Sequence, residues 1–258
     1  MLENEMSIPE LLETVDKLIE ASAKAPKLNE GEINRLTQQF MVEYTYNSNA
    51  IEGNTLTLRE TALVILEGLT IDKKPLKDHL EAVGHKDAFD YIITKSKEKE
   101  PLTERTIKDI HSLVLVSDAE NKGKYREVPV VISGALDTPP DPIYIPERMR
   151  QLLNEYESDA RHPVEKIADF HIQFERIHPF IDGNGRTGRL IMNLELIKAG
   201  LKPIDVKFKD RELYISCFPD YEITGHSEKF VKMVAKYEIE ELNNLVAISW
   251  QKDKRSRF

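Results

Sequence analysis

One short segment, residues 177–189, brings together a histidine, an aspartate, an asparagine, two arginines and three glycines; it reads IHPFIDGNGRTGR. Apolar residues follow it at helical spacing, so the segment is predicted to lie at the N-terminus of a helix. Unpaired amides and the positive end of the helix dipole favour a bound phosphate at such a position. Three glycines allow backbone N–H groups to converge on an anion, at Gly183, Gly185 and Gly188.

The other residue types in this segment also suit phosphate chemistry. Arg186 and Arg189 lie three apart on the first predicted turn, where guanidinium groups can bind phosphate oxygens in pairs. Asp182 offers a hard oxygen ligand for Mg²⁺ shared with the phosphates. His178, with an unperturbed pKa of about 6.5, suits a general base that takes a proton from a hydroxyl. The segment therefore predicts a phosphate site with a base beside it.

This segment resembles the signature of the Fic family (filamentation induced by cAMP), HxFx(D/E)GNGRxxR, at every specified position. The resemblance implies transfer of AMP from ATP to a protein hydroxyl. It implies that His178 deprotonates the hydroxyl, that Asp182 holds Mg²⁺, and that the phosphates are bound by Asn184, Gly183, Gly185, Arg186 and Arg189. The related death-on-curing branch carries a lysine at the position of Gly185 and acts as a kinase, so the glycine favours nucleotidyl transfer.

A second motif lies at the end of a helix predicted over about 30–53. Glu52 falls in its last turn, where the helix dipole disfavours a carboxylate unless a cation compensates, and Gly53 is placed to end the helix. Residues 48–53, SNAIEG, resemble the Fic inhibitory motif (S/T)xxxE(G/N), which begins here at Ser48. By that resemblance Glu52 pairs with Arg189 and occupies the place of the γ-phosphate. The alternative is a solvated glutamate at a helix end.

Helical periodicity over most of the chain predicts a mainly α fold, a Fic-type helical bundle. We predict an N-terminal helical arm over 1–75, a Fic core over 76–220 with its catalytic loop at 178–189, and a C-terminal helix and tail over 221–258. Within the core, β-branched runs flank a turn-rich stretch, which predicts one β-hairpin over about 128–145. The preceding residues 123–126, GKYR, and this hairpin resemble the Fic flap, which borders the active site and binds a target by strand addition; the alternative is a plain surface hairpin.

Three further residues are interpreted from their surroundings. His171 lies on the apolar face of a predicted helix, which favours a core histidine over a catalytic one. His111 is expected to be a surface or packing histidine. Residues 210–214 resemble the family segment whose aromatic residue flanks the nucleotide, so Tyr214 is predicted to contact the adenosine, with simple packing as the alternative.

Composition limits the other classes of function. The 258 residues carry a net charge of −9, which does not indicate a nucleic-acid partner. Cys217 is the single cysteine, so no intrachain disulfide can form and a reducing compartment is expected. No apolar run approaches a membrane span, and the acidic N-terminus does not read as a signal peptide. We therefore expect a cytoplasmic protein without a membrane partner.

Taken together, these patterns predict an ATP- and Mg²⁺-dependent protein adenylyltransferase, a nucleotidyltransferase that is autoinhibited in cis by Glu52. The expected acceptors are Ser, Thr or Tyr hydroxyls of a target protein or of the chain itself. Three alternatives stay open: a Fic enzyme with another phosphate-linked donor, an enzyme that removes AMP, and a nucleotide-sensing binding module with little turnover. His178 beside Asp182 favours an enzyme, because a binding module needs no base. A homo-oligomer is also left open.

Overall fold

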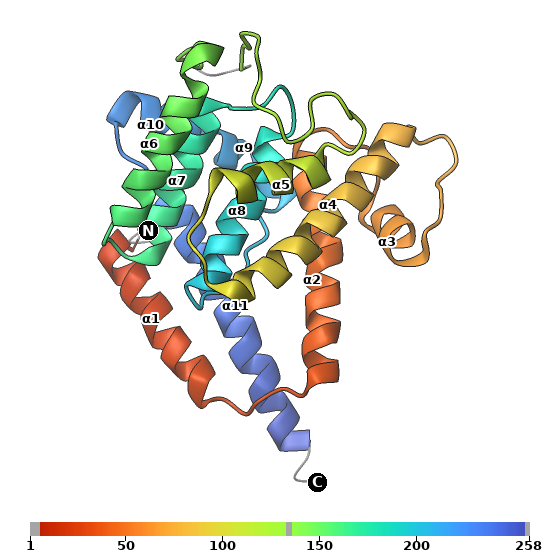
Figure 1. Cartoon of the computed structure of the whole chain (residues 1–258). Coiled ribbons are helices and arrows are strands. Elements are labelled where there is room, and N and C mark those ends of the chain that lie inside the picture. The colour runs from red at the N-terminus through yellow and green to blue at the C-terminus, as the bar shows by residue number, and fades with distance from the viewer. Residues whose placement is uncertain (1–5, 133–135, 256–258) are drawn as a thin grey trace.

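The computed structural model describes residues 6–132 and 136–255 (Figure 1). Within these ranges the chain folds into α-helices and three short 3₁₀ helices, and no β-strand is formed. The α-helices are α1 (Ile8–Lys24), α2 (Glu30–Ile51), α3 (Leu58–Glu67), α4 (Leu76–Lys95), α5 (Glu104–Val114), α6 (Ile145–Ser158), α7 (Pro163–Ile177), α8 (Asn184–Lys198), α9 (Arg211–Ile215), α10 (Cys217–Thr224) and α11 (Glu228–Arg255). The prediction of a mainly α fold is confirmed.

The central element is α8. Nearly every residue from Asn184 to Leu196 is buried, so this helix is enclosed on all sides. It packs against α7, α4 and α5, and α2 crosses near its N-terminus. Two apolar clusters meet on it: one is shared with α1, α7 and α11, and the other with α2, α4, α5, α6 and α7. The glycine-rich loop that precedes α8 is therefore held between helices from both halves of the chain.

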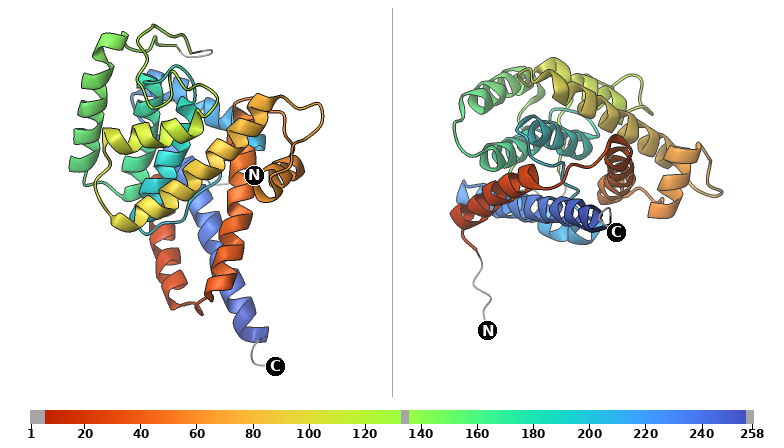
Figure 2. Two further views of the ribbon diagram at one scale, coloured as in Figure 1. Left: turned by 45° about the vertical axis from the view of Figure 1, so that its right-hand side comes forward. Right: turned by 90° about the horizontal axis from the view of Figure 1, so that it is seen from below.

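The N-terminal and C-terminal helices pack on each other. Figure 2 shows α1 and α2 projecting from the body beside α11, and α1 makes extensive contact with α11. Lys252 near the end of α11 forms an ion pair with Glu32 on the first turn of α2, with 2.5 Å between Nζ and Oε2. The predicted arm over 1–75 and the predicted C-terminal part over 221–258 are thus in direct contact.

Capping residues explain where the N-terminal helices begin. Ser7 with Glu10 and Thr57 with Glu60 form the capping boxes that their spacing predicts, at the starts of α1 and α3. Asn29 forms a third such box with Glu32 at the start of α2. The box sets the start of α2, a helix of 22 residues. The other end of α2 lies at the catalytic loop, where Glu52 meets Arg189.

The prediction of a β-hairpin over 128–145 is wrong for the described part of that range; residues 133–135 lie outside it. On its C-terminal side, Pro142–Tyr144 is a 3₁₀ helix and Ile145 begins α6. The side chain of Asp141 accepts a hydrogen bond of 3.1 Å from the N–H of Ile143, and prolines occupy the first helical positions. These are helix-starting features, and they outweigh the β-branched character of the run.

Within the described ranges, no helix combines the length and the apolar content that crossing a membrane would require.

Candidate active site

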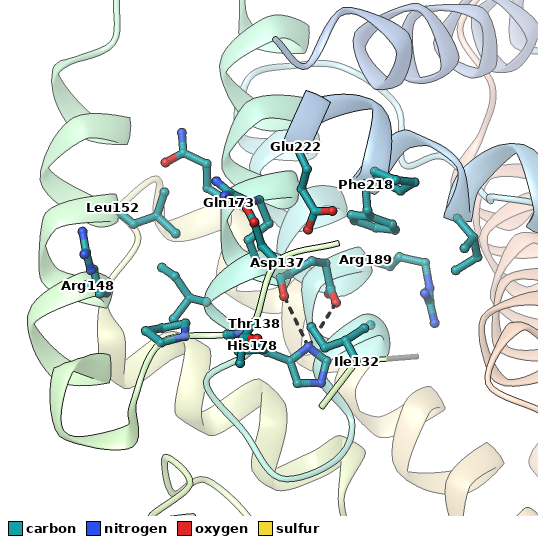
Figure 3. A pocket seen from close by; sticks show the side chains of 18 of the residues that line it. Ile132, Asp137, Thr138, Arg148, Leu152, Gln173, His178, Arg189, Phe218 and Glu222 are labelled. Atoms are coloured by element: carbon teal, nitrogen blue, oxygen red, sulfur yellow. Dashed lines mark hydrogen bonds and ion pairs between the residues drawn. The ribbon is translucent and has the colours of Figure 1, made fainter. Parts of the chain in front are cut away.

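The loop between α7 and α8 opens into a cavity of about 570 Å³, a volume typical of small-molecule sites. Its walls come from the end of α2, from residues on either side of 133–135, and from α6 to α10. Figure 3 shows this cavity and several of its lining residues, among them Arg148, Leu152, Gln173, Phe218 and Glu222. Of the predicted site residues, those lining it are Glu52, His178, Gly185, Arg189 and Tyr214.

His178 is the residue that ends α7. Its backbone is left-handed, with φ of 48°, and its N–H donates to the carbonyl oxygen of Phe174 at 3.0 Å. The ring atom Nδ1 lies 3.3 Å from the carbonyl oxygen of Glu175. We assign the proton to Nδ1 on that basis, which leaves Nε2 as a free acceptor. Burial holds the pKa of His178 below its usual range, so the ring is neutral at pH 7, as a base requires.

Asn184 and His111 hold the loop in shape from inside. Asn184 accepts from the N–H of Phe180 at 2.9 Å and donates to its carbonyl oxygen at 2.8 Å, and its side chain is buried. The structure therefore places Asn184 away from the predicted phosphate contact. His111 stacks on Phe180 with ring centres 3.7 Å apart, and its Nε2 lies 2.9 Å from the carbonyl oxygen of Asp182. His111 is thus a packing residue, and a fully buried one.

The first turn of α8 is left open toward an anion. Gly183 precedes it with φ of 77°, a left-handed conformation that favours glycine. No described side chain caps this helix, so its first amides are not satisfied by the usual capping bond. The Asp182 carboxylate, whose side chain is half exposed, accepts from the N–H of Gly183 at 2.6 Å. A carboxylate therefore lies beside the N-terminus of α8, whose Gly185 lines the cavity.

Arg189 reaches this point from the second turn of α8 and is the buried cation of the site. Its Nη2 lies 2.8 Å from Oε1 of Glu52. Its Nε donates to Oγ of Ser48 at 3.1 Å, and Nη2 also donates to the Ser48 carbonyl oxygen at 2.9 Å. Arg189 is only 1% exposed. The guanidinium is therefore bound on one side to the last turn of α2.

Glu52 lies over the N-terminus of α8. A Cβ atom added to Gly185 would overlap with Oε1 of Glu52, so the absence of a side chain at 185 makes room for this carboxylate. Glu52 ends α2 and is followed by Gly53, whose φ of 92° turns the chain away. The Glu52 side chain is 38% exposed, so it borders the solvent of the cavity. The solvated glutamate considered as an alternative is not what the structure shows.

Arg186 does not face the cavity. Its side chain is 2% exposed, its Nη1 lies 3.0 Å from Oε1 of Glu81 on α4, and its Nη2 lies 3.4 Å from Oδ1 of Asp182. The prediction that both arginines reach phosphate from the cavity therefore fits the position of Arg189 and does not fit that of Arg186 in this conformation. Sequence spacing placed both on one turn but did not show which side each would face.

Gly188 and Tyr214 serve packing in this structure. A Cβ on Gly188 would come within 2.7 Å of Oε1 of Glu175 and 3.0 Å of Cε1 of His171, so glycine lets α7 and α8 approach closely. Tyr214 is buried, and its hydroxyl lies 2.9 Å from Nε2 of His171. His171 also stacks on Phe230, which makes it the core histidine that was expected. The position of Tyr214 fits the packing alternative, and an adenosine contact stays a prediction.

Two further residues lie near His178 and were not among the predicted site residues. Arg126 donates from Nε to the carbonyl oxygen of His178 at 2.8 Å. Glu175 lines the cavity with a largely buried carboxyl group, and burial together with the Glu52 carboxylate raises its pKa to about 8. Neither residue belongs to the signature; Arg126 ends the 123–126 stretch that resembles the Fic flap, and Glu175 lies in no motif. Their contacts at His178 are recognisable only in the folded structure, because the sequence does not show how Arg126 and the end of α7 pack.

Comparison with known proteins agrees with this fold. Residues 101–196 match the Fic/DOC family. The protein adenylyltransferase Fic of Nematostella vectensis is 31% identical over 232 residues, which are 87% of this chain and 53% of the relative. A Fic domain containing signaling protein from Bacteroides thetaiotaomicron superposes with a TM-score of 0.83 at 28% identity, covering 92% of this chain and 97% of that one. Fic-1 from C. elegans gives 0.85 at 26% identity, covering 95% of this chain and 73% of that one.

The family match covers the central part of the chain, and the helices on either side of it extend this Fic domain. The chain belongs to the Fic/DOC family. It spans about half the length of the curated relatives that it matches.

Proposed function

We propose that this chain is a protein adenylyltransferase that transfers AMP from ATP to a hydroxyl side chain and is inhibited by Glu52. One observation carries the proposal. The protein's own carboxylate, Glu52, binds Arg189 at 2.8 Å directly over Gly185, at the open N-terminus of a helix and in the cavity that His178 lines. An anion site is therefore present and is filled from within the chain. The name of the relatives, protein adenylyltransferase Fic, supports the same reaction.

In the proposed reaction, His178 takes the proton of the acceptor hydroxyl on Nε2. The hydroxyl oxygen forms a bond to the α-phosphorus of ATP, and the bond from that phosphorus to the bridging oxygen of pyrophosphate breaks. Pyrophosphate leaves with the electron pair of that bond. The first amides of α8 and the Arg189 guanidinium face the charge that develops on the phosphates. The proton is later released from His178 to solvent.

The donor groups at Asp182 fit a Mg²⁺ ion that arrives with the nucleotide. Asp182 is the half-exposed carboxylate beside the α8 N-terminus, and Mg²⁺ usually takes one or two carboxylates together with substrate phosphates. Within the described ranges, no group of three or more His, Cys, Asp or Glu side chains forms a complete metal site. We therefore propose that Asp182 would hold Mg²⁺, which would neutralise phosphate charge, only when ATP is bound.

Inhibition follows from competition for Arg189. The γ-phosphate of ATP and the Glu52 carboxylate are both anions that suit the same guanidinium and the same helix N-terminus. Ser48 strengthens the inhibited arrangement because it accepts two hydrogen bonds from Arg189. ATP that lies with its γ-phosphate displaced would not present the α-phosphorus to the hydroxyl. The proposed inhibition thus lowers the apparent affinity for ATP in the pose that permits transfer.

The test is incorporation of radioactive phosphate from ATP labelled at the α or at the γ position, with Mg²⁺, into the purified chain and into a cell lysate. Wild type is compared with Glu52→Gly, His178→Ala and the double variant. We expect α label only, increased by Glu52→Gly and absent whenever His178 is replaced. Equal incorporation by wild type and Glu52→Gly would contradict inhibition by Glu52.

Other outcomes would select the remaining alternatives. Label from the γ position alone would identify a kinase, and loss of AMP from a modified protein would identify the reverse hydrolytic activity. Tight ATP binding by Glu52→Gly without any transfer would indicate a nucleotide-sensing module. A parallel assay with other nucleoside triphosphates distinguishes that module from a transferase with another donor.

A further inference from the structure

Arg126 is a buried cation that binds only backbone carbonyl groups among its described hydrogen bonds. It is 5% exposed. Its Nε donates to the carbonyl oxygen of His178 at 2.8 Å, Nη1 donates to that of Val128 at 3.0 Å, and Nη2 donates to that of Pro140 at 2.7 Å. Its own N–H donates to the carbonyl oxygen of Pro179 at 2.9 Å. One residue thus contacts three separate parts of the chain.

This arrangement is not explained by stability alone. Burying a guanidinium without a carboxylate partner carries a desolvation penalty of several kcal/mol, and no described carboxylate lies within ion-pair distance of Arg126. Burial accordingly lowers the pKa of Arg126 from its usual value. Charge-assisted hydrogen bonds to three carbonyl oxygens offset the penalty. A guanidinium suits this role because its three nitrogens hold their donors in a rigid plane, so each nitrogen can bind a different carbonyl group.

The three carbonyl groups belong to the two structures that must be aligned for transfer. His178 supplies the base, from a left-handed backbone position that depends on external support. Val128 and Pro140 lie on the two sides of residues 133–135, and the described residues between them line the cavity at Ile132 and at 137–140. We call 128–132 and 136–140 the cavity wall. Arg126 therefore joins the base to both sides of this wall.

Arg126 itself is not part of the cavity lining. Its guanidinium reaches the site only through the backbone groups that it holds. A residue in this position can set the angle between the base and whatever lies on the wall without contacting the nucleotide phosphates. This distinguishes it from Arg189, which does line the cavity.

We propose that Arg126 is a positioning residue that fixes His178 relative to the cavity wall, and that it acts on the transfer step and not on nucleotide binding. The inference rests on the proposed function, in which His178 is the base.

The experiment compares Arg126→Gln and Arg126→Lys, each in the Glu52→Gly background, with Arg105→Gln as a matched control. Arg105 is an exposed arginine on α5 that pairs only with Asp109 on its own helix. Three quantities are measured: the affinity for Mg²⁺-ATP by calorimetry, kcat and KM for AMP transfer, and amide hydrogen exchange. The parent Glu52→Gly variant is included in every series.

We expect both Arg126 variants to bind Mg²⁺-ATP within about twofold of the parent, while kcat falls on the order of a hundredfold, the size expected from misplacing a reacting group by about 1 Å. Arg126→Lys is expected to fold and still to lose kcat, because the three donors of an ammonium group share one nitrogen and cannot reproduce bonds made from three separate guanidinium nitrogens. The rate of amide hydrogen exchange should rise both in the cavity wall and in residues 178–180. It should stay unchanged in α8. Arg105→Gln should match the parent throughout.

An unchanged kcat in Arg126→Lys would overturn the proposal, and so would a loss of ATP affinity as large as the loss of kcat. A rise in exchange confined to the wall would also overturn it, since the base would then not depend on Arg126. If the Glu52→Gly parent transfers no AMP, the proposed function fails. Hydrogen exchange and ATP affinity still decide in that case whether Arg126 joins His178 to the wall.

Discussion

The two arginines of the catalytic loop lie three residues apart and each pairs with a glutamate from another helix, yet their settings differ. Arg189 pairs with Glu52 at the end of α2, and Arg186 pairs with Glu81 in the middle of α4. The Glu52 side chain is 38% exposed and lines the cavity, whereas that of Glu81 is 9% exposed and does not. The first pair can therefore exchange its carboxylate for a ligand, and the second is part of the folded core.

The largest effect expected from this difference is on stability. Glu81→Gln leaves the Arg186 charge buried without its main partner, which should lower the free energy of unfolding by about 3–5 kcal/mol. Glu52→Gln should lower it by less, because Glu52 borders the solvent of the cavity and Arg189 keeps its hydrogen bonds to Ser48 and to the Tyr214 hydroxyl. Urea denaturation of both variants at pH 7 measures the two values. Similar losses in both would show that the two pairs are equivalent.

The next effect is on the affinity for ATP, and it is expected only for the Glu52–Arg189 pair. Glu52→Gly should strengthen ATP binding by about tenfold, a coupling of about 1.4 kcal/mol between the carboxylate and the ligand. AMP, which lacks the γ-phosphate, should gain much less. Calorimetric titration of both nucleotides makes the comparison. Glu81→Gln is the control and should not strengthen either one, so a gain in that variant would contradict the assignment of Arg186 to the core.

A smaller effect is expected at Ser48, which supports the exchangeable pair from α2. Ser48→Ala leaves the buried Nε of Arg189 without its acceptor at 3.1 Å, which should destabilise the fold by about 1–2 kcal/mol. It should also raise AMP transfer above wild type, by less than Glu52→Gly does. Thermal melting and the α-label assay give the two results. Transfer equal to that of wild type would show that Ser48 does not contribute to inhibition.

A further effect is a pH dependence of stability on the Arg189 side of the comparison. Burial, and next the Glu52 carboxylate, raise the pKa of Glu175 from 4.5 to about 8. Between those pH values the unfolded chain loses this proton first, so the group lowers stability as pH rises toward 8. The melting temperature of Glu175→Gln relative to wild type should therefore increase by several degrees from pH 5 to pH 8.

The same experiment in the Glu52→Gly background sharpens that result. Removing the Glu52 charge lowers the pKa of Glu175, so the difference between Glu175→Gln and its parent should shrink. An equal pH dependence in both backgrounds would show that Glu175 does not sense Glu52. Melting is followed by circular dichroism at four or five pH values in the same buffer system.

Much of the fold was predictable because its signals are local. The capping boxes at Ser7 and Thr57, the glycine after Glu52 and the apolar periodicity of α7 are each readable from a few neighbouring residues. The hairpin prediction failed because β-branched residues were weighted above the Asp-Pro helix start at Asp141. The Asp-Pro pair at 141–142 is visible in the sequence and predicts a helix start better than the β-branched residues beside it predict a strand.

The residues of the site could be predicted from the sequence, but the directions in which their side chains point could not. The signature identified His178 and the loop, and the resemblance also indicated the pairing of Glu52 with Arg189 that the structure contains. It did not show that Arg186 turns toward Glu81 or that Asn184 binds Phe180. Those directions depend on partners more than 100 residues away or on the closure of the loop on itself, and neither leaves a periodic trace in the sequence.

The end of α2 is anchored on both sides of Glu52. Before it, Ser48 is bound by Arg189. After it, the side chain of Asn54 donates to Oε2 of Glu81 at 2.9 Å, and the N–H of Thr55 donates to Oδ2 of Asp78 at 2.8 Å. Glu52 can therefore leave Arg189 by rotation of its own side chain, without departure of the helix.

That anchoring has a kinetic consequence. Rotation of a partly exposed side chain takes place in picoseconds to nanoseconds, far faster than a nucleotide arrives. The anion site would thus be open for a fixed fraction of the time, and the apparent dissociation constant for ATP would be the intrinsic one divided by that fraction. ATP binding to wild type should follow a single exponential without a lag, and inhibition of this kind weakens gradually as the ATP concentration rises.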